Sequence, residues 1–277
     1  MPFPNTADQS FRRQPESVSR FASQTRSGTT PNLRKQLNSV EPHAHPVHPQ
    51  TILPAGYRVD EIGSARADYA LDGFETTDPN GLTLQIVHRP FVFAEPPSAA
   101  FGPLEMVHPF LWTSQYEASE HFYVDILGFR PSDYIARKLV FLRGADRWHH
   151  SLALLQSDSF SVAHLCFLMP SLEHVMRGRA RAMYRDVELP VDLVKHSASE
   201  SVAIYLHEPR FGPWIELCDS HRRLTVAEDD HEHLPRRMAD DPRNVMDVWR
   251  AAADHDWRVA SGSDGSQSRN APFMPDA

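Results

Sequence analysis

The sequence predicts an α+β fold in which one structural unit, strand-helix-strand-strand-strand, occurs twice in succession. Two observations predict it. In both halves of residues 104–225, short apolar strands and an amphipathic helical stretch follow one another in the same order. A strand-turn-strand segment at residues 67–88 also matches the end of such a unit. We therefore expect two complete units preceded by part of a third.

The first complete unit covers roughly residues 104–154. Its expected elements, in order, are a strand at 106–113, a helix at 115–127, and strands near 134–136, 139–143 and 150–155. Ser114 is the expected N-cap of the helix, because a serine hydroxyl can accept a hydrogen bond from a free N–H of the first turn. Gly128 should end the helix, since glycine readily adopts the left-handed conformation found there.

The second complete unit repeats this plan. Its expected elements are a strand at 162–169, a helix at 171–183 with Ser171 as N-cap, and strands near 193, 202–206 and 214–218. The two halves together define a predicted core domain at residues 104–225.

The partial unit lies within residues 55–103 and has a turn at Asp78-Pro79-Asn80-Gly81, where Pro and Gly fix the φ angles. Gln85 stands four residues beyond Gly81, as Glu216 stands four residues beyond Gly212. The two hairpins therefore align in register, with an amide in the first where the second has a carboxylate. Because an amide is a poor ligand for Fe(II) or Mn(II), the first hairpin is predicted to be a structural copy that binds no metal.

Both ends of the chain differ in composition from the centre. Residues 1–54 are rich in Ser, Pro, Gln, Arg and Thr without a sustained period, which predicts a disordered segment. Their Arg-rich start also fits an organelle transit peptide, although prolines interrupt an amphipathic helix. Residues 226–277 are expected to form a C-terminal extension. In it, the acidic run at 228–233 is expected to be solvated, and residues 241–257 to form a short closing helix before a frayed tail.

The overall composition excludes some classes of partner. The net charge of −8, from 28 basic and 36 acidic residues, argues against nucleic acid. No apolar stretch is long enough to span a bilayer, and no apolar signal-peptide core follows Met1. Cys166 and Cys218 lie within predicted strands and are expected to be reduced, buried thiols. These features predict a cytoplasmic protein with neither a nucleic-acid nor a membrane partner.

Three apolar segments that are typical of buried strands each contain one metal-ligand residue: His108, His164 and Glu216, separated by 56 and 52 residues. Two imidazoles and one carboxylate on one face of an ion, with open positions opposite, are the ligand set of non-heme Fe(II) oxygenases. A lone buried histidine is more often an ordinary core residue. A buried carboxylate, however, is costly unless it is paired or bound to metal, so Glu216 is the strongest indicator.

Further motifs resemble the vicinal oxygen chelate superfamily and, within it, the type I extradiol ring-cleaving dioxygenases. The helix end at residues 122–129, Phe-Tyr-Val-Asp-Ile-Leu-Gly-Phe, is similar to a feature common to the whole superfamily. The doubled histidine at residues 149–150 before Ser-Leu-Ala-Leu, together with His196 and Tyr205, is more specific to the ring-cleaving branch. The resemblance covers about residues 56–220.

This resemblance implies that the strands of both units curl into a mixed sheet around a metal held by His108, His164 and Glu216. The ion would be Fe(II), with Mn(II) as the alternative. The implied reaction inserts both atoms of O₂ into a catechol-type ring next to its hydroxyls. His150 would act as the acid/base residue beside O₂, and His196 and Tyr205 would hydrogen-bond the catecholate.

Neighbouring side chains of a strand face opposite ways, so only one residue of the doubled histidine can face this site. The resemblance selects His150, and His149 is expected to face solvent or to lie behind the site.

The chain departs from the family pattern in two places. Only the second half of the non-catalytic N-terminal domain is recognisable, and a half-unit would expose an apolar face and an unpaired edge. We expect truncation, an unusual start, or completion by homo-oligomerisation. Ser197 and Ala198 follow His196 where the family has polar amide or acid side chains, so substrate contacts should differ there.

Other interpretations stay open. A non-oxidative relative, such as a glyoxalase-like isomerase, an epimerase or a resistance-type transferase, would share the fold, and so would a degenerate ligand-binding relative. Tyr205 and the two cysteines could serve core packing alone. Four aromatic residues are candidates either for the lining of a substrate pocket or for the core: Phe110, Trp112, Trp148 and Phe211.

Overall fold

The computed structural model describes residues 47–62, 70–90, 102–136, 138–232, 235–238 and 246–249. The predicted disorder of residues 1–46 and the predicted tail at 258–277 lie outside these residues, as does most of the expected helix at 241–257. Order begins earlier than the sequence suggested. A short helix, α1 (Pro49–Ile52), continues into the turn η1 (Leu53–Ala55), and Ile52 is fully buried.

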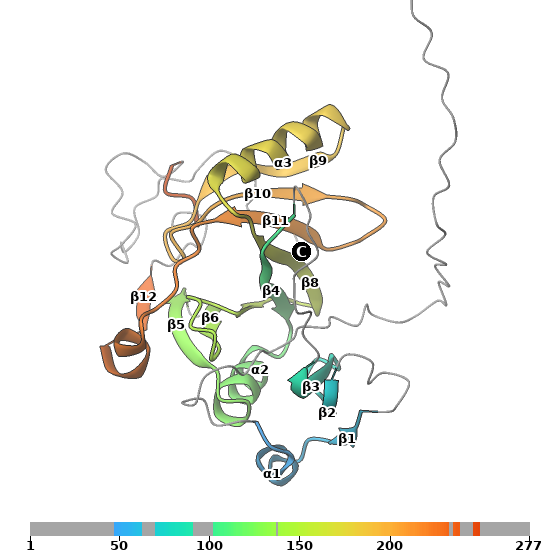
Figure 1. The fold of residues 1–277 in the computed structure, drawn as a ribbon. Helices are drawn as coiled ribbons and strands as arrows, with labels where there is room; N and C mark the ends of the chain where they lie inside the picture. The colour runs from blue at the N-terminus through green and yellow to red at the C-terminus, as the bar shows by residue number, and fades with distance from the viewer. Residues whose placement is uncertain are drawn as a thin grey trace, which may run out of the picture. The chain divides into compact units, whose positions relative to one another are not determined.

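The described strands form two sheets (Figure 1). The smaller, antiparallel sheet has the order β1-β2-β3, with β1 at Asp60–Glu61, β2 at Ala70–Thr77 and β3 at Thr83–Pro90. The larger sheet is mixed and has the order β12-β5-β6-β7-β4-β8-β11-β10-β9. Its strands are β4 (Glu105–Thr113), β5 (Arg130–Ile135), β6 (Leu139–Arg143), β7 (Leu152–Gln156), β8 (Ser161–Leu168), β9 (Glu188–Lys195), β10 (Val202–His207), β11 (Trp214–Asp219) and β12 (Arg236–Met238).

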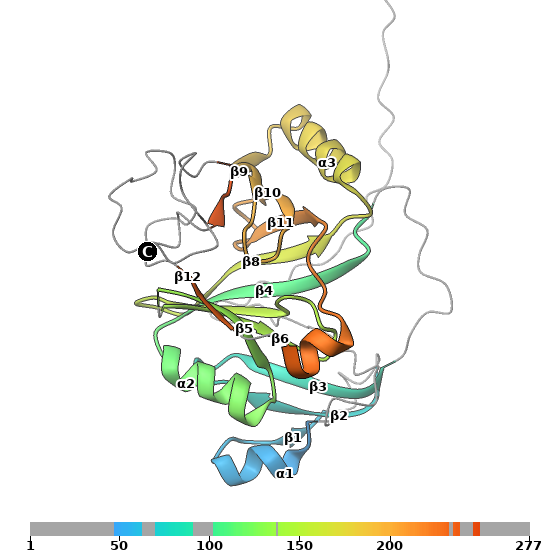
Figure 2. The same cartoon turned by 90° about the vertical axis from the view of Figure 1, so that its left-hand side faces the viewer.

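The larger sheet confirms the repeated unit. In the first unit, β4 pairs in parallel with the last strand, β7; in the second, β8 pairs in parallel with β11. The two units meet where β4 and β8 pair antiparallel, at the centre of the sheet (Figure 2). This junction places the first strand of each unit side by side, with the last strand of each unit flanking the pair.

One helical segment follows the first strand of each unit. In the first unit, α2 (Tyr116–His121) continues as a π-helical turn, η3 (Phe122–Ile126), and Gly128 follows with a φ of 76°. The predicted cap at Ser114 is wrong: the cap position is Gln115, whose N–H is bonded by the Thr113 hydroxyl at 3.0 Å. In the second unit, α3 (Leu172–Tyr184) begins after Ser171 as expected and packs on β9, β10 and β11 (Figures 1 and 2).

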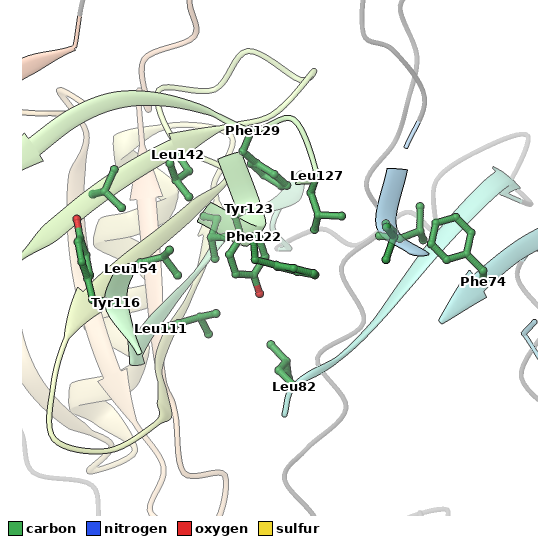
Figure 3. Packing of buried hydrophobic residues seen from close by; sticks show 14 residues of the cluster. Phe74, Leu82, Leu111, Tyr116, Phe122, Tyr123, Leu127, Phe129, Leu142 and Leu154 are labelled. Carbon is green, nitrogen blue, oxygen red and sulfur yellow. The ribbon is translucent and has the colours of Figure 1, made fainter. Parts of the chain in front are cut away.

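The smaller sheet shares a core with the first complete unit. Phe74, Leu82 and Ile86 from the hairpin belong to the same buried cluster as Leu111 of β4 and Phe122 of the helical segment (Figure 3). Polar contacts join the same parts, because the Asn80 side chain donates to Ser119 Oγ at 2.9 Å and accepts from Thr113 Oγ1 at 2.7 Å. The apolar face of the partial unit is therefore covered from within the chain.

The C-terminal segment adds an edge to the larger sheet. Strand β12 pairs in parallel with β5, after a π-helical turn, η4 (Glu228–Glu232). The expectation of a fully solvated acidic run is wrong at Asp229, which is only 6% exposed and accepts hydrogen bonds from Arg130 and Arg143. Within the parts of the chain that the structure describes, no helix has the length and apolar character needed to cross a bilayer.

Candidate active site

Three adjacent strands bring the predicted metal ligands together. His108 lies on β4, His164 on β8 and Glu216 on β11, and pairing aligns the strands so that Phe110 is opposite His164, which is opposite Trp214. All three ligand side chains are at least nine-tenths buried. The sheet thus converts residues far apart in sequence into one cluster.

The three ligand atoms form a nearly equilateral triangle. His108 Nε2 lies 3.3 Å from His164 Nε2 and 3.5 Å from Glu216 Oε2, and His164 Nε2 lies 3.1 Å from Glu216 Oε2. Atoms bound at about 2.1 Å on one face of an octahedral divalent ion lie roughly 3 Å apart. The donor set therefore fits a divalent ion such as Fe(II) or Mn(II) in both chemistry and spacing.

The electrostatics of Glu216 match this arrangement. Burial alone would raise its pKa, but the imidazoles of His108, His164 and His196 around it hold the pKa well below its ordinary value. The carboxylate is thus ionised in a dry pocket and offers a full negative charge to a cation.

His150 adjoins the triangle from the first unit. Its Nε2 atom lies 3.3 Å from His108 Nε2, and the two ring centroids are 4.0 Å apart. Burial, together with the neighbouring rings of His108 and His221, lowers the pKa of His150 well below its ordinary value. A neutral imidazole has one free lone pair, so His150 can accept a proton at the edge of the triangle.

His149 does not face solvent. It is fully buried and its Nε2 lies 2.8 Å from Asp133 Oδ2, while its Nδ1 lies 3.0 Å from His150 Nδ1. As expected, His150 and not His149 lines the pocket, but residues 149–151 form a bend before β7 and are not part of that strand. The opposite face is nevertheless covered, because β5 and β12 supply Asp133 and Arg236 there.

His196 and Tyr205 approach the triangle from the second unit. His196 Nε2 lies 2.9 Å from the Tyr205 hydroxyl and 3.4 Å from Glu216 Oε1. The Met246 carbonyl lies 2.7 Å from His196 Nδ1 and can only accept a hydrogen bond, so Nδ1 carries a proton. Burial and the Glu216 carboxylate raise the pKa of Tyr205 well above its ordinary value, which keeps the phenol protonated.

A small pocket opens onto these groups. Its free space is about 290 Å³, including the mouth. Apart from the six predicted site residues, its lining among the described residues consists of Phe110, Phe141, Ala198, Ser199 and Met246. Of the aromatic candidates, Phe110 is therefore confirmed as a lining residue. Phe211 is 51% exposed and does not line the pocket.

Two residues near the site had no signal in the sequence. His221 is 5% exposed, and the centroid of its ring lies 4.6 Å from that of His150 and 5.4 Å from that of His108. Neither of its ring nitrogens has a hydrogen-bond partner among the residues that the structure describes. With His108 and His150 it forms a second group close enough to hold an ion. Met246 reaches the pocket from a segment separated from β11 by a long stretch of chain.

The two cysteines are free and buried, and their sulfur atoms are 3.4 Å apart. They lie beside Glu216 and could form a third metal group with it. Burial raises the pKa of the Cys166 thiol well above its ordinary value, and the pKa of Cys218 is also raised. Because metals bind the thiolate, these protonated thiols favour packing over ligation.

Several known proteins are similar to this chain in sequence or in fold. No family model matches the chain. Over 152 residues the chain is 30% identical to an iron-dependent extradiol dioxygenase of Rhodococcus jostii strain RHA1, an alignment covering 48% of this chain and 51% of that protein. The chain therefore spans about half the length of this curated relative.

Solved structures show the same fold. A Mn(II)-bound glyoxalase from Novosphingobium aromaticivorans superposes with a TM-score of 0.61 at 22% identity, covering 72% of this chain and 65% of that one. The halotolerant catechol dioxygenase BphC gives 0.62 at 19% identity, covering 72% and 68%. The 2,2',3-trihydroxybiphenyl 1,2-dioxygenase of Sphingomonas wittichii strain RW1 gives 0.59 at 20% identity, covering 68% and 69%. These likenesses show that the chain has the fold of these glyoxalase and dioxygenase structures.

Proposed function

We propose that this protein is an extradiol dioxygenase that cleaves a catechol-type ring next to its hydroxyls and incorporates both atoms of O₂. The observation that carries the proposal is one pocket holding the triangle of His108, His164 and Glu216 together with His150 on one side and His196 and Tyr205 on the other. The sequence similarity to the iron-dependent extradiol dioxygenase of R. jostii also supports this function.

The triangle would hold Fe(II), or Mn(II) as the alternative. A divalent ion with open positions supplies Lewis acidity toward the two ring oxygens and a place for O₂ next to them. Glu216 contributes the single negative charge of the set, while His108 and His164 contribute neutral nitrogens. The resulting site carries a net positive charge, which favours binding of a deprotonated diol.

The surrounding side chains would transfer protons, hydrogen-bond the ring oxygens and pack against the ring. His150 accepts a proton at Nε2 from a ring hydroxyl and can return it later to an oxygen of the opening ring. The Tyr205 hydroxyl, whose own proton is held by the raised pKa, can turn from His196 to donate to a ring oxygen. Phe110, Phe141 and Met246 give the ring an apolar wall.

A second function is favoured by one comparison. The TM-score of the Mn(II)-bound glyoxalase, 0.61, lies between those of the two dioxygenases, 0.62 and 0.59, so a non-oxidative isomerase with the same two-oxygen binding is the alternative. The expected cytoplasmic location and homo-oligomeric state stay predictions from the sequence.

Oxygen consumption separates the two functions. Anaerobically purified protein, loaded with Fe(II) or Mn(II), is given a panel of catechols, and O₂ uptake is followed together with the absorbance of ring-opened product. Uptake of one O₂ per catechol, lost in Glu216→Ala, is the expected result. Tight binding of the ion without O₂ uptake from any catechol would contradict the proposal and direct attention to hemithioacetal-type isomerase substrates.

A further inference from the structure

Behind His150, on the side away from the pocket, four side chains form a continuous hydrogen-bonded chain. Arg236 donates from Nε to Asp133 Oδ1 at 2.8 Å and from Nη2 to Asp133 Oδ2 at 2.5 Å. Asp133 Oδ2 then lies 2.8 Å from His149 Nε2, and His149 Nδ1 lies 3.0 Å from His150 Nδ1. Asp133 and His149 are fully buried, so water does not compete for these bonds.

The charge on Asp133 fixes the direction of the first bonds. Burial alone would raise its pKa, but the hydrogen bonds from His149 and Arg236 outweigh burial and lower the pKa below its ordinary value. An ionised carboxylate can only accept, so His149 Nε2 must carry a proton and donate it. Arg236 already balances the charge of Asp133, and a second cation at His149 would be buried among neighbouring imidazoles without compensation. His149 is therefore neutral.

A neutral His149 protonated at Nε2 has its lone pair on Nδ1. The short contact to His150 Nδ1 then requires that His150 Nδ1 carries the proton and donates it. The lone pair of His150 is left on Nε2, the atom that faces His108 and the pocket. The same logic, in which a buried carboxylate sets the tautomer of a histidine, operates in the catalytic triad of serine proteases, although here a second imidazole stands between the two.

We propose that Arg236, Asp133 and His149 are positioning residues that hold His150 as the tautomer with Nδ1 protonated and Nε2 free to accept a proton. The proposal deepens the role given to His150 above and rests on the proposed function only for its kinetic consequence. Because Arg236 lies on β12, this strand also helps to position Asp133, in addition to forming the edge of the sheet. A C-terminal segment thereby controls a side chain of the first unit.

Asp133→Asn tests the proposal with almost no change of shape. The amide oxygen can stay at the Oδ1 position, which accepts from Nε and the backbone N–H of Arg236. Its NH₂ group then replaces Oδ2, so it gives up the bond from Arg236 Nη2 and faces His149 Nε2 as a donor. His149 must then carry its proton on Nδ1 and donate to His150 Nδ1, which leaves the proton of His150 on Nε2. The variant should thus have the wrong tautomer at an intact site.

The first measurement is ¹⁵N–¹H correlation of the histidine rings in metal-free protein, with the His150 signals assigned from a His150→Gln variant. We expect His150 to be protonated at Nδ1 in the natural protein and at Nε2 in Asp133→Asn. Asp229→Asn is the matched control, because it breaks another buried Asp–Arg pair of the same sheet and should leave the His150 signals unchanged. A natural protein with His150 protonated at Nε2 would overturn the proposal.

The second measurement is the kinetics of the metal-loaded variants on a catechol. Asp133→Asn should lower kcat by about 10² to 10⁴-fold while KM changes little, whereas Asp229→Asn should retain kcat within about twofold. Equal losses in both variants would indicate a merely structural role. If Asp133→Asn does not fold, His149→Phe fills the same space without an acceptor, and His150 should then lose its single tautomer. If the natural protein consumes no O₂, the NMR result still decides the tautomer.

Discussion

At the scale of single residues, His108 has two buried neighbours, Glu216 and His221, and only the first is a proposed metal ligand. Glu216 lies at one corner of the ligand triangle, and His221, whose ring centroid is 5.4 Å from that of His108, belongs to a second group with His108 and His150. If the triangle holds the ion, Glu216→Gln should lower metal affinity by more than about 100-fold, because it replaces the only anionic ligand with a neutral amide. His221→Asn should change the affinity by less than about threefold.

Calorimetric titration of each variant with Fe(II) and Mn(II) under anaerobic conditions measures both metal affinities. The side chains of Glu216 and His221 are both buried and both adjoin His108, so a loss of affinity caused merely by disturbing the structure around His108 should appear in both variants. A loss of affinity in His221→Asn as large as that in Glu216→Gln would place the ion in the group of three histidines instead.

The three metal-ligand candidates could be predicted because each lies in a strand whose local pattern identifies it, whereas His150 and His196 lie just outside β7 and β9 and came from the family resemblance. His108, His164 and Glu216 stand in apolar runs where a polar side chain is conspicuous. His221 has no such pattern, since it follows the end of β11 and reaches the site only through the path of the chain after Ser220. The surroundings of His149 were equally hidden, because Asp133 and Arg236 are 16 and 87 residues away along the chain.

At the scale of elements, β12 joins the sheet by backbone pairing with β5 and by one ion pair to a buried carboxylate. Its Arg236 is about one-third exposed, but its partner Asp133 is fully buried. Arg236→Met should lower the free energy of unfolding by about 2 to 3 kcal/mol at neutral pH, because it leaves the buried Asp133 carboxylate with His149 and the backbone N–H of residue 236 but without a guanidinium to balance its charge. Chemical denaturation of the metal-free protein measures this difference.

The same pair predicts a pH dependence. The pKa of Asp133 in the folded protein lies below its ordinary value of 3.8, so the contribution of the pair is complete above that pH. It is lost as the pH falls below 3.8, when Asp133 takes up a proton. The stability difference between the natural protein and Arg236→Met should therefore be constant near neutral pH and close in acid. A difference that grows in acid would contradict this assignment.

Elements were predicted well where they depend on local periodicity. The strand at 139–143 has the expected bounds, and the helix at 115–127 differs mainly in its π-helical second half. The expectations that proved wrong depended on contacts with distant residues. The cap moved from Ser114 to Gln115 because the Thr113 hydroxyl, held by Asn80 of the hairpin, bonds the Gln115 N–H. Asp229, expected to be solvated, is buried because it forms ion pairs with two arginines of β5 and β6.

At the scale of the whole described chain, the partial unit is stabilised by the first complete unit. The sequence correctly indicated a hairpin in register with the β10–β11 hairpin: Glu75 is opposite Gln85, as Tyr205 is opposite Glu216. The sequence could not show that the first complete unit covers the apolar face of the hairpin, because that depends on how the two units are placed relative to each other. Leu82 packs in one cluster with Leu111, Tyr123 and Leu154 (Figure 3).

This shared core predicts that the hairpin and the first unit unfold together. Leu82→Ala in the hairpin and Leu154→Ala in β7 each remove a buried side chain, so each should lower the free energy of unfolding by about 2 to 5 kcal/mol. Leu104→Ala is the matched control, because Leu104 is 65% exposed and its loss should cost less than about 0.5 kcal/mol. Hydrogen exchange resolves the units: in Leu82→Ala, the slowest amides of β3 and of β7 should lose protection by the same free energy, since one cooperative opening exposes both. Loss of protection in β3 alone, with β7 unchanged, would mean that the hairpin opens independently and that the first unit keeps its fold without that cover.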